Sequence, residues 1–183
     1  VEDAEGDLWL PEHPVSCVDR QGAGAFAAWE RSRTGQGWRL AGELEWEKAA
    51  RGVDGRFFPW GDGLDPSWCC YRDSHVDRML PVVVDTFPTD VSVYGVRGMG
   101  GNMRDWCADS YEKGGPGVTD NRLQKLIVDM SPDRGRRAVR GGAWDVSARS
   151  TRVADRNGNF PWSRYPDLGF RFVRFPSPEQ IGF

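Results

Sequence analysis

Two segments of the chain repeat small and aromatic residues at helical spacing. Between residues 18 and 29 such residues recur every three or four positions, which predicts an amphipathic helix over residues 19–33. Gly35 follows directly and is predicted to end this helix. A second helix is predicted over residues 42–51, with Gly52 as its stop signal.

Short apolar runs predict strands in four places, and turn-forming residues fill the chain between them. The runs are residues 37–40, 81–87, 138–144 and 168–174. Residues 114–137 are polar and begin with a Gly-Gly-Pro-Gly turn, so we expect them to form a mobile excursion from the body of the fold. Because no internal repeat or linker divides the chain, residues 1–183 are predicted to form one domain.

The composition favours a loop-rich α+β fold. The hydrophobic fraction of 39% is low for a domain with a large helical core. The 23 Gly, 12 Pro and 9 Trp residues indicate many turns held in place by large aromatic anchors. These features suit an α+β domain better than a helical bundle or a doubly wound sheet.

Charge and cysteine content restrict the classes of partner. The net charge of −3 lacks the basic excess of nucleic-acid-binding proteins, and the arginines of residues 134–140 are predicted to lie in a solvated loop. The four cysteines form no Cys-x-x-Cys pair, and two histidines are too few for a histidine-based metal centre. No apolar run of about 18 residues predicts a membrane span.

The same features bear on the compartment. The acidic start of the chain is not a secretory signal, so we expect reduced thiols and a cytoplasmic protein. The chain also opens without Met, which fits a fragment whose targeting segment is missing.

Five short segments occur in an order typical of one family. They are the helix motif of residues 38–52, Phe-Pro-Trp-Gly-Asp (58–62), Gly-Asn-Met-Arg-Asp-Trp (101–106), Arg-Gly-Gly-Ala-Trp (140–144) and Gly-Phe-Arg (169–171). Together they resemble the signature of the formylglycine-generating enzyme, or sulfatase-modifying factor, family. The resemblance implies an α+β, C-type-lectin-like fold with two helices, small twisted antiparallel sheets and many long loops. Family members usually have a further strand before the Pro14 region, so that N-terminal part is either missing here or replaced by residues 1–13.

The motifs also predict contacts of their own. Charged residues on or beside the second helix are expected to form ion pairs that fix it to the sheet. These residues are Arg39, Glu43, Glu45 and Arg51. Gly141 and Gly142 permit a close approach of the backbone, and Trp144 is expected to fill the adjacent space as a core residue.

The resemblance raises the question of catalysis. The family's oxidase places two copper-binding cysteines just after the Arg-Gly-Gly motif, and those positions here are Val146 and Thr151. Neither side chain supplies the soft thiolate that copper(I) needs. Iron-dependent relatives use histidines from a separate domain, which this chain lacks. A Ser–His–Asp arrangement would need His13 or His75, and local hydrogen bonding explains His75 equally well.

We therefore expect no catalytic residues and predict that the chain is not an enzyme but a ligand-binding recognition domain. Two alternatives stay open. One is an oxidase-type relative with an unrecognised metal site, and the other is a structural domain without a ligand site.

Calcium is the cofactor that the resemblance brings into question. Family members bind it near the Gly-Asn motif through carboxylate or amide oxygens and main-chain carbonyls. Asp105 takes the family's acidic position and Met103 offers a carbonyl, whereas Gly98 replaces a residue that is usually Asp or Asn. Either Asp105 and Met103 help to hold a calcium ion, or Asp105 caps or pairs locally.

Residues 145–167 lie between two strands that the flanking motifs fix, and they carry the candidate ligand site. Rigid aromatics stand among Ser, Asn, Gly and Arg, a composition typical of evolved binding loops. The candidate ligand-binding residues are Asp145, Val146, Ser147, Ser150, Asp155, Asn157, Gly158, Phe160, Trp162, Ser163, Arg164 and Tyr165. We expect them to bind a protein or another macromolecular ligand. The alternative is that the aromatics cover the core beneath the loop.

Two narrower resemblances suggest different hosts for such a domain. Residues 145–167 are similar to the variable segment of proteins diversified by retroelements. Variation at the adenines of asparagine codons yields Asp, Ser, Gly, Tyr, Phe or Val, which fits most candidates but not Trp162. Residues 38–52 and 68–75 look instead like sensor or effector domains attached to bacterial serine/threonine kinases. Both resemblances imply binding, and they differ in the partner.

Overall fold

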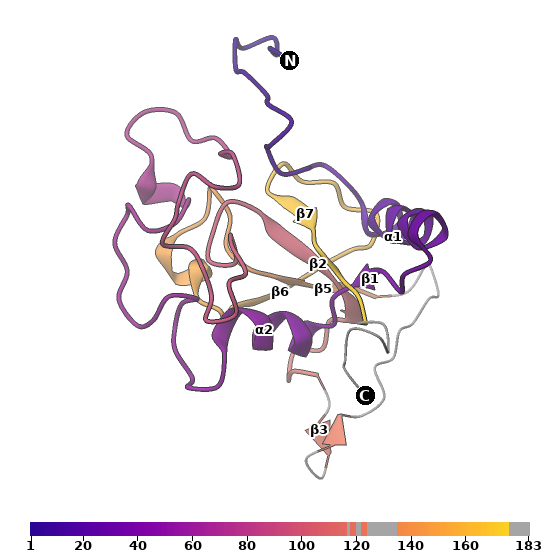
Figure 1. Cartoon of the computed structure of the whole chain (residues 1–183). Helices are drawn as coiled ribbons and strands as arrows, with labels where there is room; N and C mark the ends of the chain where they lie inside the picture. Colours follow the sequence, from indigo (N-terminus) through magenta and orange to yellow (C-terminus); the bar gives the residue numbers. More distant parts are fainter. Residues whose placement is uncertain (117, 120–121, 124–134, 176–183) are drawn as a thin grey trace.

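The computed structural model describes residues 1–116, 118–119, 122–123 and 135–175 (Figure 1). Two helices, α1 (Arg20–Thr34) and α2 (Glu43–Arg51), accompany a four-stranded sheet. The strand order in this sheet is β6 (Arg156–Asn159), β5 (Arg137–Arg140), β2 (Arg104–Ser110) and β7 (Leu168–Phe170). Helix α2 packs against β5 and β2 and lies below the sheet in Figure 1.

Shorter elements complete the fold. Strand β1 (Arg39–Leu40) pairs with β8 (Phe172–Val173), and β3 (Val118–Thr119) pairs with β4 (Arg122–Leu123). The fold also has two short 3-10 helices, η1 (Arg72–Ser74) before β2 and η2 (Ala148–Thr151) between β5 and β6. The predicted combination of two helices, small sheets and long loops is confirmed. Most of the predicted excursion over residues 114–137 lies outside the described residues.

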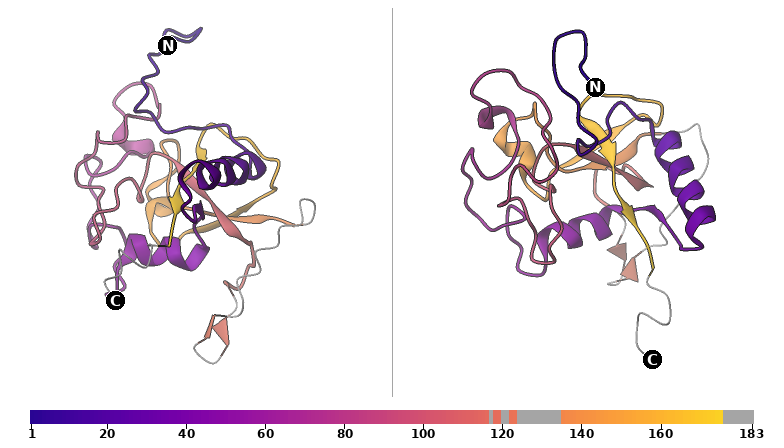
Figure 2. Two further views of the ribbon diagram at one scale, coloured as in Figure 1. Left: turned by 45° about the vertical axis from the view of Figure 1, so that its right-hand side comes forward. Right: turned by 45° about the horizontal axis from the view of Figure 1, so that its top comes forward.

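The direction of the strands gathers three chain segments at one edge of the sheet. β5 runs antiparallel to both β2 and β6, whereas β2 and β7 are parallel, with Arg104 opposite Leu168. The start of β2, the start of β7 and the end of β5 therefore meet at the same edge. Figure 2 shows this edge together with the N-terminal segment that crosses β7.

Both helices begin and end where their capping residues predict. The Asp19 carboxylate accepts the Gly22 N–H at 2.7 Å, and this hydrogen bond is the main cause of the lowered pKa of Asp19. Gly35 ends α1 with a φ of 68°, in the left-handed region that favours glycine. At the start of α2, the Glu45 carboxylate accepts the Gly42 N–H at 2.7 Å. These bonds satisfy donors that the first helical turn leaves unpaired.

The prediction of a strand over residues 81–87 is wrong. The Asn102 side chain accepts the Val82 N–H at 2.9 Å and donates to the Val82 carbonyl at 2.8 Å. One amide side chain therefore takes both polar backbone groups that a neighbouring strand would have paired. The backbone of Asn102 itself has a φ of 68°, a conformation that Asn tolerates better than most residues.

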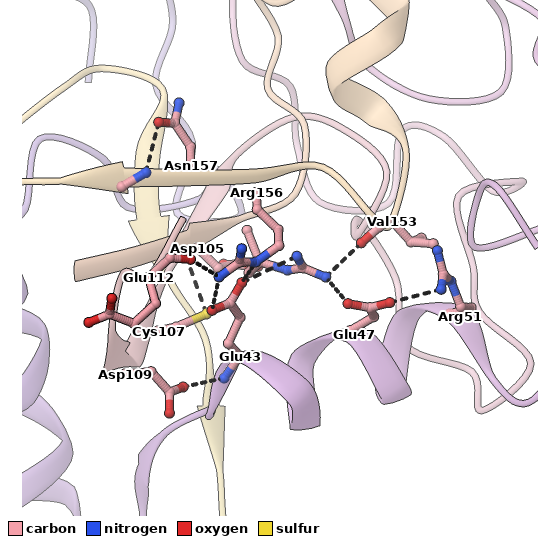
Figure 3. A network of polar contacts seen from close by, with 12 residues as sticks. Glu43, Glu47, Arg51, Asp105, Cys107, Asp109, Glu112, Val153, Arg156 and Asn157 are labelled. Atoms are coloured by element: carbon pink, nitrogen blue, oxygen red, sulfur yellow. Dashed lines mark hydrogen bonds and ion pairs between the residues drawn. The ribbon is translucent and has the colours of Figure 1, made fainter. Parts of the chain in front are cut away.

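A buried charged network fixes α2 to the sheet. Glu43, at the start of α2, is 1% exposed and pairs with Arg140, which is fully buried on β5. Arg140 Nη2 also donates to Glu47 at 2.5 Å and to the Val153 carbonyl at 2.8 Å. Figure 3 shows Arg156 of β6 joining the same carboxylate of Glu43. The predicted role of Glu43 in fixing the helix is confirmed.

The network extends through an aromatic ring to β2. The Arg140 guanidinium lies 5.3 Å from the ring centroid of Trp46, and Trp46 Nε1 donates to Asp105 at 2.8 Å. Asp105 in turn accepts from Arg171 Nε at 2.5 Å. Charged and aromatic side chains thus link α2, β5, β2 and the residue between β7 and β8.

Removing Glu43 should destabilise the fold far more than removing a surface carboxylate. We expect Glu43→Ala to cost about 3–5 kcal/mol of unfolding free energy, because Arg140 and Arg156 would both lose the buried carboxylate that they share. Urea unfolding measures this loss. Glu30→Ala is the matched control, since Glu30 pairs with the exposed Arg33 on α1 and should change stability little. Equal losses in the two variants would contradict a central role for the network.

Candidate functional site

Three charged side chains meet where β2, β5 and β7 share an edge, and we call them the sheet-edge cluster: Arg104, Asp145 and Asp167. Arg104 opens β2 and Asp167 directly precedes β7, so their pairing at 3.5 Å follows from the parallel register. Burial is the main cause that raises the pKa of Asp167, and the charge of Asp145 raises it further against the opposing effect of Arg104. The cluster therefore combines two carboxylates with one guanidinium.

Asp145 is held by its backbone and leaves a polar atom unused. Its carbonyl accepts from Arg72 Nε and Nη2 at 3.1 and 2.9 Å. Its side-chain Oδ1 is buried and has no hydrogen-bond partner among the described residues. A buried acceptor without a donor is costly to the fold.

Next to Asp145, the backbone of Trp144 lies close to His75 and Cys70. His75 Nε2 lies 3.1 Å from the Trp144 carbonyl oxygen and 3.7 Å from Cys70 Sγ. Burial raises the pKa of Cys70 to about 12, which keeps it a thiol at neutral pH. Trp144 was expected in the core, but it is half-buried and donates from Nε1 to the Pro166 carbonyl at 3.4 Å. Its indole N–H explains this, because Trp prefers a place where that group finds a partner.

The residues at the family's copper positions do not fit copper. Val146 is an apolar side chain at 9% exposure, and the buried Thr151 hydroxyl donates to the Ala148 carbonyl at 2.7 Å. Cys107 is the cysteine of β2, and burial raises its pKa strongly. In the part of the chain that the structure describes, no three His, Cys, Asp or Glu side chains are grouped as metal ligands.

Residues 145–167, predicted to form ligand-binding loops between two strands, also contain a strand that was not predicted. Strand β6 runs through this segment and pairs with β5, with Arg156 opposite Arg140. Its Arg-Asn-Gly-Asn sequence has no apolar alternation, which is why the strand was not predicted.

Three of the candidates are buried, closely packed or already hydrogen-bonded within the chain. Val146 is buried, and a side chain at Gly158 would collide with the Tyr111 ring at 2.4 Å. The exposed Asn157 uses its side-chain oxygen on the Gly158 N–H. The candidates that stay near the sheet-edge cluster and η2 are Asp145, Ser147, Ser150 and Asp155.

The strand is followed by the aromatic loop, which we define as residues 160–165. Phe160, Trp162 and Tyr165 are 43%, 61% and 47% exposed. The first two rings stack with centroids 4.9 Å apart and planes 9° apart. The prediction that these residues lie at the surface is thus supported over the alternative that they cover the core.

The ends of the aromatic loop are tied to the first helix. The Arg20 N–H donates to the Pro161 carbonyl at 3.0 Å, and the Cys17 N–H donates to the Tyr165 carbonyl at 3.1 Å. Arg164 pairs with the capping residue Asp19 at 2.6 Å. The exposed rings are therefore presented on a backbone fixed at both ends. Ser163 lies between them and is partly buried.

The carboxylate considered for calcium already has a cation from the chain itself. Arg171 Nε binds Asp105, while its Nη1 and Nη2 donate to the carbonyls of Arg97 and Gly98 at 3.2 and 2.9 Å. Gly98 contributes no side-chain oxygen, and Met103 offers at most its carbonyl. Calcium takes six to eight oxygen ligands, so these residues do not fit it and we derive no role for it.

With this geometry established, comparisons with known proteins assign the family. The model of the sulfatase-modifying factor enzyme 1-like domain matches residues 5–176. The chain belongs to this family. Its predicted formylglycine-generating-enzyme type of fold is thereby confirmed.

Curated relatives match nearly the whole domain. The formylglycine-generating enzyme of Streptomyces coelicolor is 35% identical over 93% of this chain and 55% of its own length. Serine/threonine-protein kinase Pkn1 of Chlamydia trachomatis is 32% identical over 89% of this chain and 24% of its own length. The domain thus spans about half of the first relative and about a quarter of the second.

Solved structures share the fold. Treponema denticola variable protein 1 superposes with a TM-score of 0.77 and 20% identity, covering 96% of this chain and 77% of that one. PvdO from Pseudomonas aeruginosa gives a TM-score of 0.74 and 25% identity, covering 92% of this chain and 64% of that one. These likenesses confirm the predicted α+β, C-type-lectin-like fold.

The prediction that the chain is not an enzyme is wrong. Its relatives include the formylglycine-generating enzyme named above and a hercynine oxygenase of Mycolicibacterium thermoresistibile, which is 30% identical over 89% of this chain and 36% of its own length. These matches place the domain in a family of enzymes. The argument from Val146 and Thr151 concerned one copper site only, and it does not extend to other chemistry at the same fold.

Sequence reasoning missed most of the sheet-edge cluster. Arg104 lies inside the Gly-Asn-Met-Arg-Asp-Trp motif, so its position was available, but its partner Asp167 is distant in sequence. Arg72 reaches Asp145 from η1, and no local pattern predicts that contact.

On the question of membranes, none of the helices in the described residues has the length and apolar character of a span.

Chelation tests the assignment of Asp105. Because Arg171 supplies the positive charge that Asp105 needs, we expect the same melting temperature in EDTA and in millimolar calcium. Differential scanning fluorimetry measures both. A bound ion at about 100 times its dissociation constant would add about 2.7 kcal/mol, so a rise in melting temperature with calcium that Asp105→Asn abolishes would restore the metal site.

Proposed function

We propose that this domain recognises a protein segment, with the sheet-edge cluster and the aromatic loop as the contact surface. The observation that carries the proposal is the exposure of Phe160, Trp162 and Tyr165 on a backbone tied down at both ends. Exposed aromatics on fixed loops are typical of binding surfaces, because they offer contact area and lose little entropy on binding.

Charge suggests what the segment presents to the sheet-edge cluster. Asp145 and Asp167 bring two carboxylates against the single guanidinium of Arg104. A ligand with a lysine or arginine side chain would offset the charge of these carboxylates. The ligand class that fits best is therefore a peptide or protein loop with a basic residue.

The relatives support recognition as a role that this domain can have. One is named a serine/threonine kinase of which the domain is a quarter, and one structural neighbour is named a variable protein. Attachment to a kinase and diversification of residues 145–167 both belong to this proposal. The activity and partners of any longer protein that contains the domain are proposals as well.

A peptide library displayed on phage tests the surface. We expect the purified domain to enrich peptides that contain Lys or Arg. Their affinity should fall about tenfold or more in Trp162→Ala and in Asp145→Asn, because an anchor ring or an acceptor charge is lost. Phe57→Ala and Tyr94→Ala are matched controls, since both rings are 55% exposed elsewhere. Fluorescence polarisation gives the affinities and melting curves report folding.

The pH dependence of peptide binding is a second, independent test of this surface. The pKa of Asp167 is raised, so lowering the pH should protonate it earlier than an ordinary Asp and weaken the binding of basic peptides. Enriched peptides that bind Trp162→Ala and Asp145→Asn as well as the unchanged domain would refute the proposed surface.

A second candidate function is oxidation of the ligand bound at the sheet edge. The observation that favours it is the match to a formylglycine-generating enzyme and to a hercynine oxygenase along most of the domain. The test is incubation with oxygen, added copper or iron, and a cysteine-containing peptide, followed by mass spectrometry. An aldehyde in place of the cysteine thiol, in an amount that Asp145→Asn and Arg104→Ala diminish, would support this function, and an unchanged peptide in every condition would exclude it for these substrates.

A further inference from the structure

A cavity of about 350 Å³ opens beside the sheet at a place that the proposed function does not use. Pro14 and Val15 of the N-terminal segment form one wall, and Val84 and Phe170 form others. The base carries the Asp105–Arg171 ion pair. Successive residues of a strand face opposite sides, so Asp105 turns away from the side of β2 that carries Arg104.

The guanidinium of Arg171 is fixed and still has donors to spare. Its three nitrogens bind Asp105 and the carbonyls of Arg97 and Gly98, one bond each. A guanidinium has five N–H donors, so two are left after these bonds. The side chain lines the cavity and is 27% exposed, which makes these donors accessible to a small ligand.

The same cavity contains a second positively charged side chain, which is only weakly paired. Arg97 lines the cavity and is 50% exposed. Its nearest acidic partner, Asp85, is 75% exposed and lies 3.8 Å away, beyond hydrogen-bond distance. Asp105, in contrast, is 3% exposed and already engaged by Trp46 and Arg171. Asp85 also lines the cavity, and the hydrogen-bond donors that a ligand can reach there come from Arg171 and Arg97.

We propose that the cavity binds a small carboxylate-bearing molecule with a compact apolar body. Its carboxylate would accept from Arg171 and Arg97, because a guanidinium matches the two oxygens of a carboxylate. Its body would pack against Val15, Val84 and Phe170. A volume of about 350 Å³ lies at the lower end of small-molecule sites, which suits a single ring or a short aliphatic chain.

Two sources share this chemistry, namely a free organic acid and the C-terminus of a peptide. Phenylacetate and a short peptide that ends in free phenylalanine represent them as probes. Phenylacetamide and the same peptide with an amidated end are their neutral counterparts. Isothermal titration with the intact domain measures all four, in EDTA so that added metal plays no part.

We expect at least one of the two acids to bind at least about tenfold more tightly than its amide, because only the carboxylate pairs with the arginines. Arg97→Ala should weaken that acid about tenfold, whereas Arg78→Ala should not. Arg78 is a matched control, since it is 53% exposed and pairs with Asp7 away from the cavity. Val84→Asp places a negative charge on an exposed wall residue and should also weaken the acid.

The outcomes separate cleanly. Preference for the peptide over phenylacetate would assign the cavity to chain termini, and the reverse would assign it to free acids. Failure of both acids to bind, equal binding of acid and amide, or no effect of Arg97→Ala and Val84→Asp in folded protein would overturn the proposal. None of these results depends on Trp162 or Asp145, so they stand apart from the test of the peptide-binding surface.

Discussion

The pairing of Glu43 with Arg140 is the interaction on which the rest of this domain depends. Both side chains are almost completely buried, and Glu47 and Arg156 complete the network of opposite charges around them. Arg140 sits on β5 opposite Asp105 of β2, so the pair also fixes the register of the central strands. The apolar core is small, with alanines at several central positions, and polar contacts supply much of the specificity in its place.

Strand β2 places charged side chains in two separate environments, one on each of its faces. Arg104 and Asp105 are neighbours in sequence and face opposite sides. On one side the strand ends of β5 and β7 bring carboxylates to Arg104, and on the other Arg171 covers Asp105 beside a cavity. One side gathers two carboxylates around Arg104, and the other is a cavity with two arginines in its lining. A single rigid strand therefore sets the position of both, while the loops around them determine what each side presents.

The parts of this arrangement that sequence predicted are those with local signals. Asp19 and Gly35 bound the first helix because capping is a matter of a few adjacent residues. Three consecutive valines are also a local signal, but the strand that they predicted does not form. The side chain of Asn102, from a distant turn, forms hydrogen bonds with the backbone of Val82 instead. β6 carries no signal at all, since its pairing with β5 rather than its own side chains makes it a strand.

The candidate site shows the same division. The aromatic loop was recognisable because exposed rings among polar residues have a distinctive composition. Asp167, Arg72 and Arg171 were not recognisable, because their roles come from strand direction and long-range contacts. The prediction that the chain is not an enzyme was wrong because the lack of a few recognised catalytic sites does not exclude other chemistry on the same fold.

The pairing of β1 with β8 has a consequence for how the domain reaches its native state. Arg39 must find Val173, near the opposite end of the domain, before this ladder can close. Contacts between such distant residues are entropically expensive to nucleate and slow the search for the native topology. During synthesis, the first helices are complete long before their last partner strand leaves the ribosome. The nascent chain therefore passes through a period in which Phe26 and Trp38 lack their contacts with Phe172 of β8 and are open to chaperones.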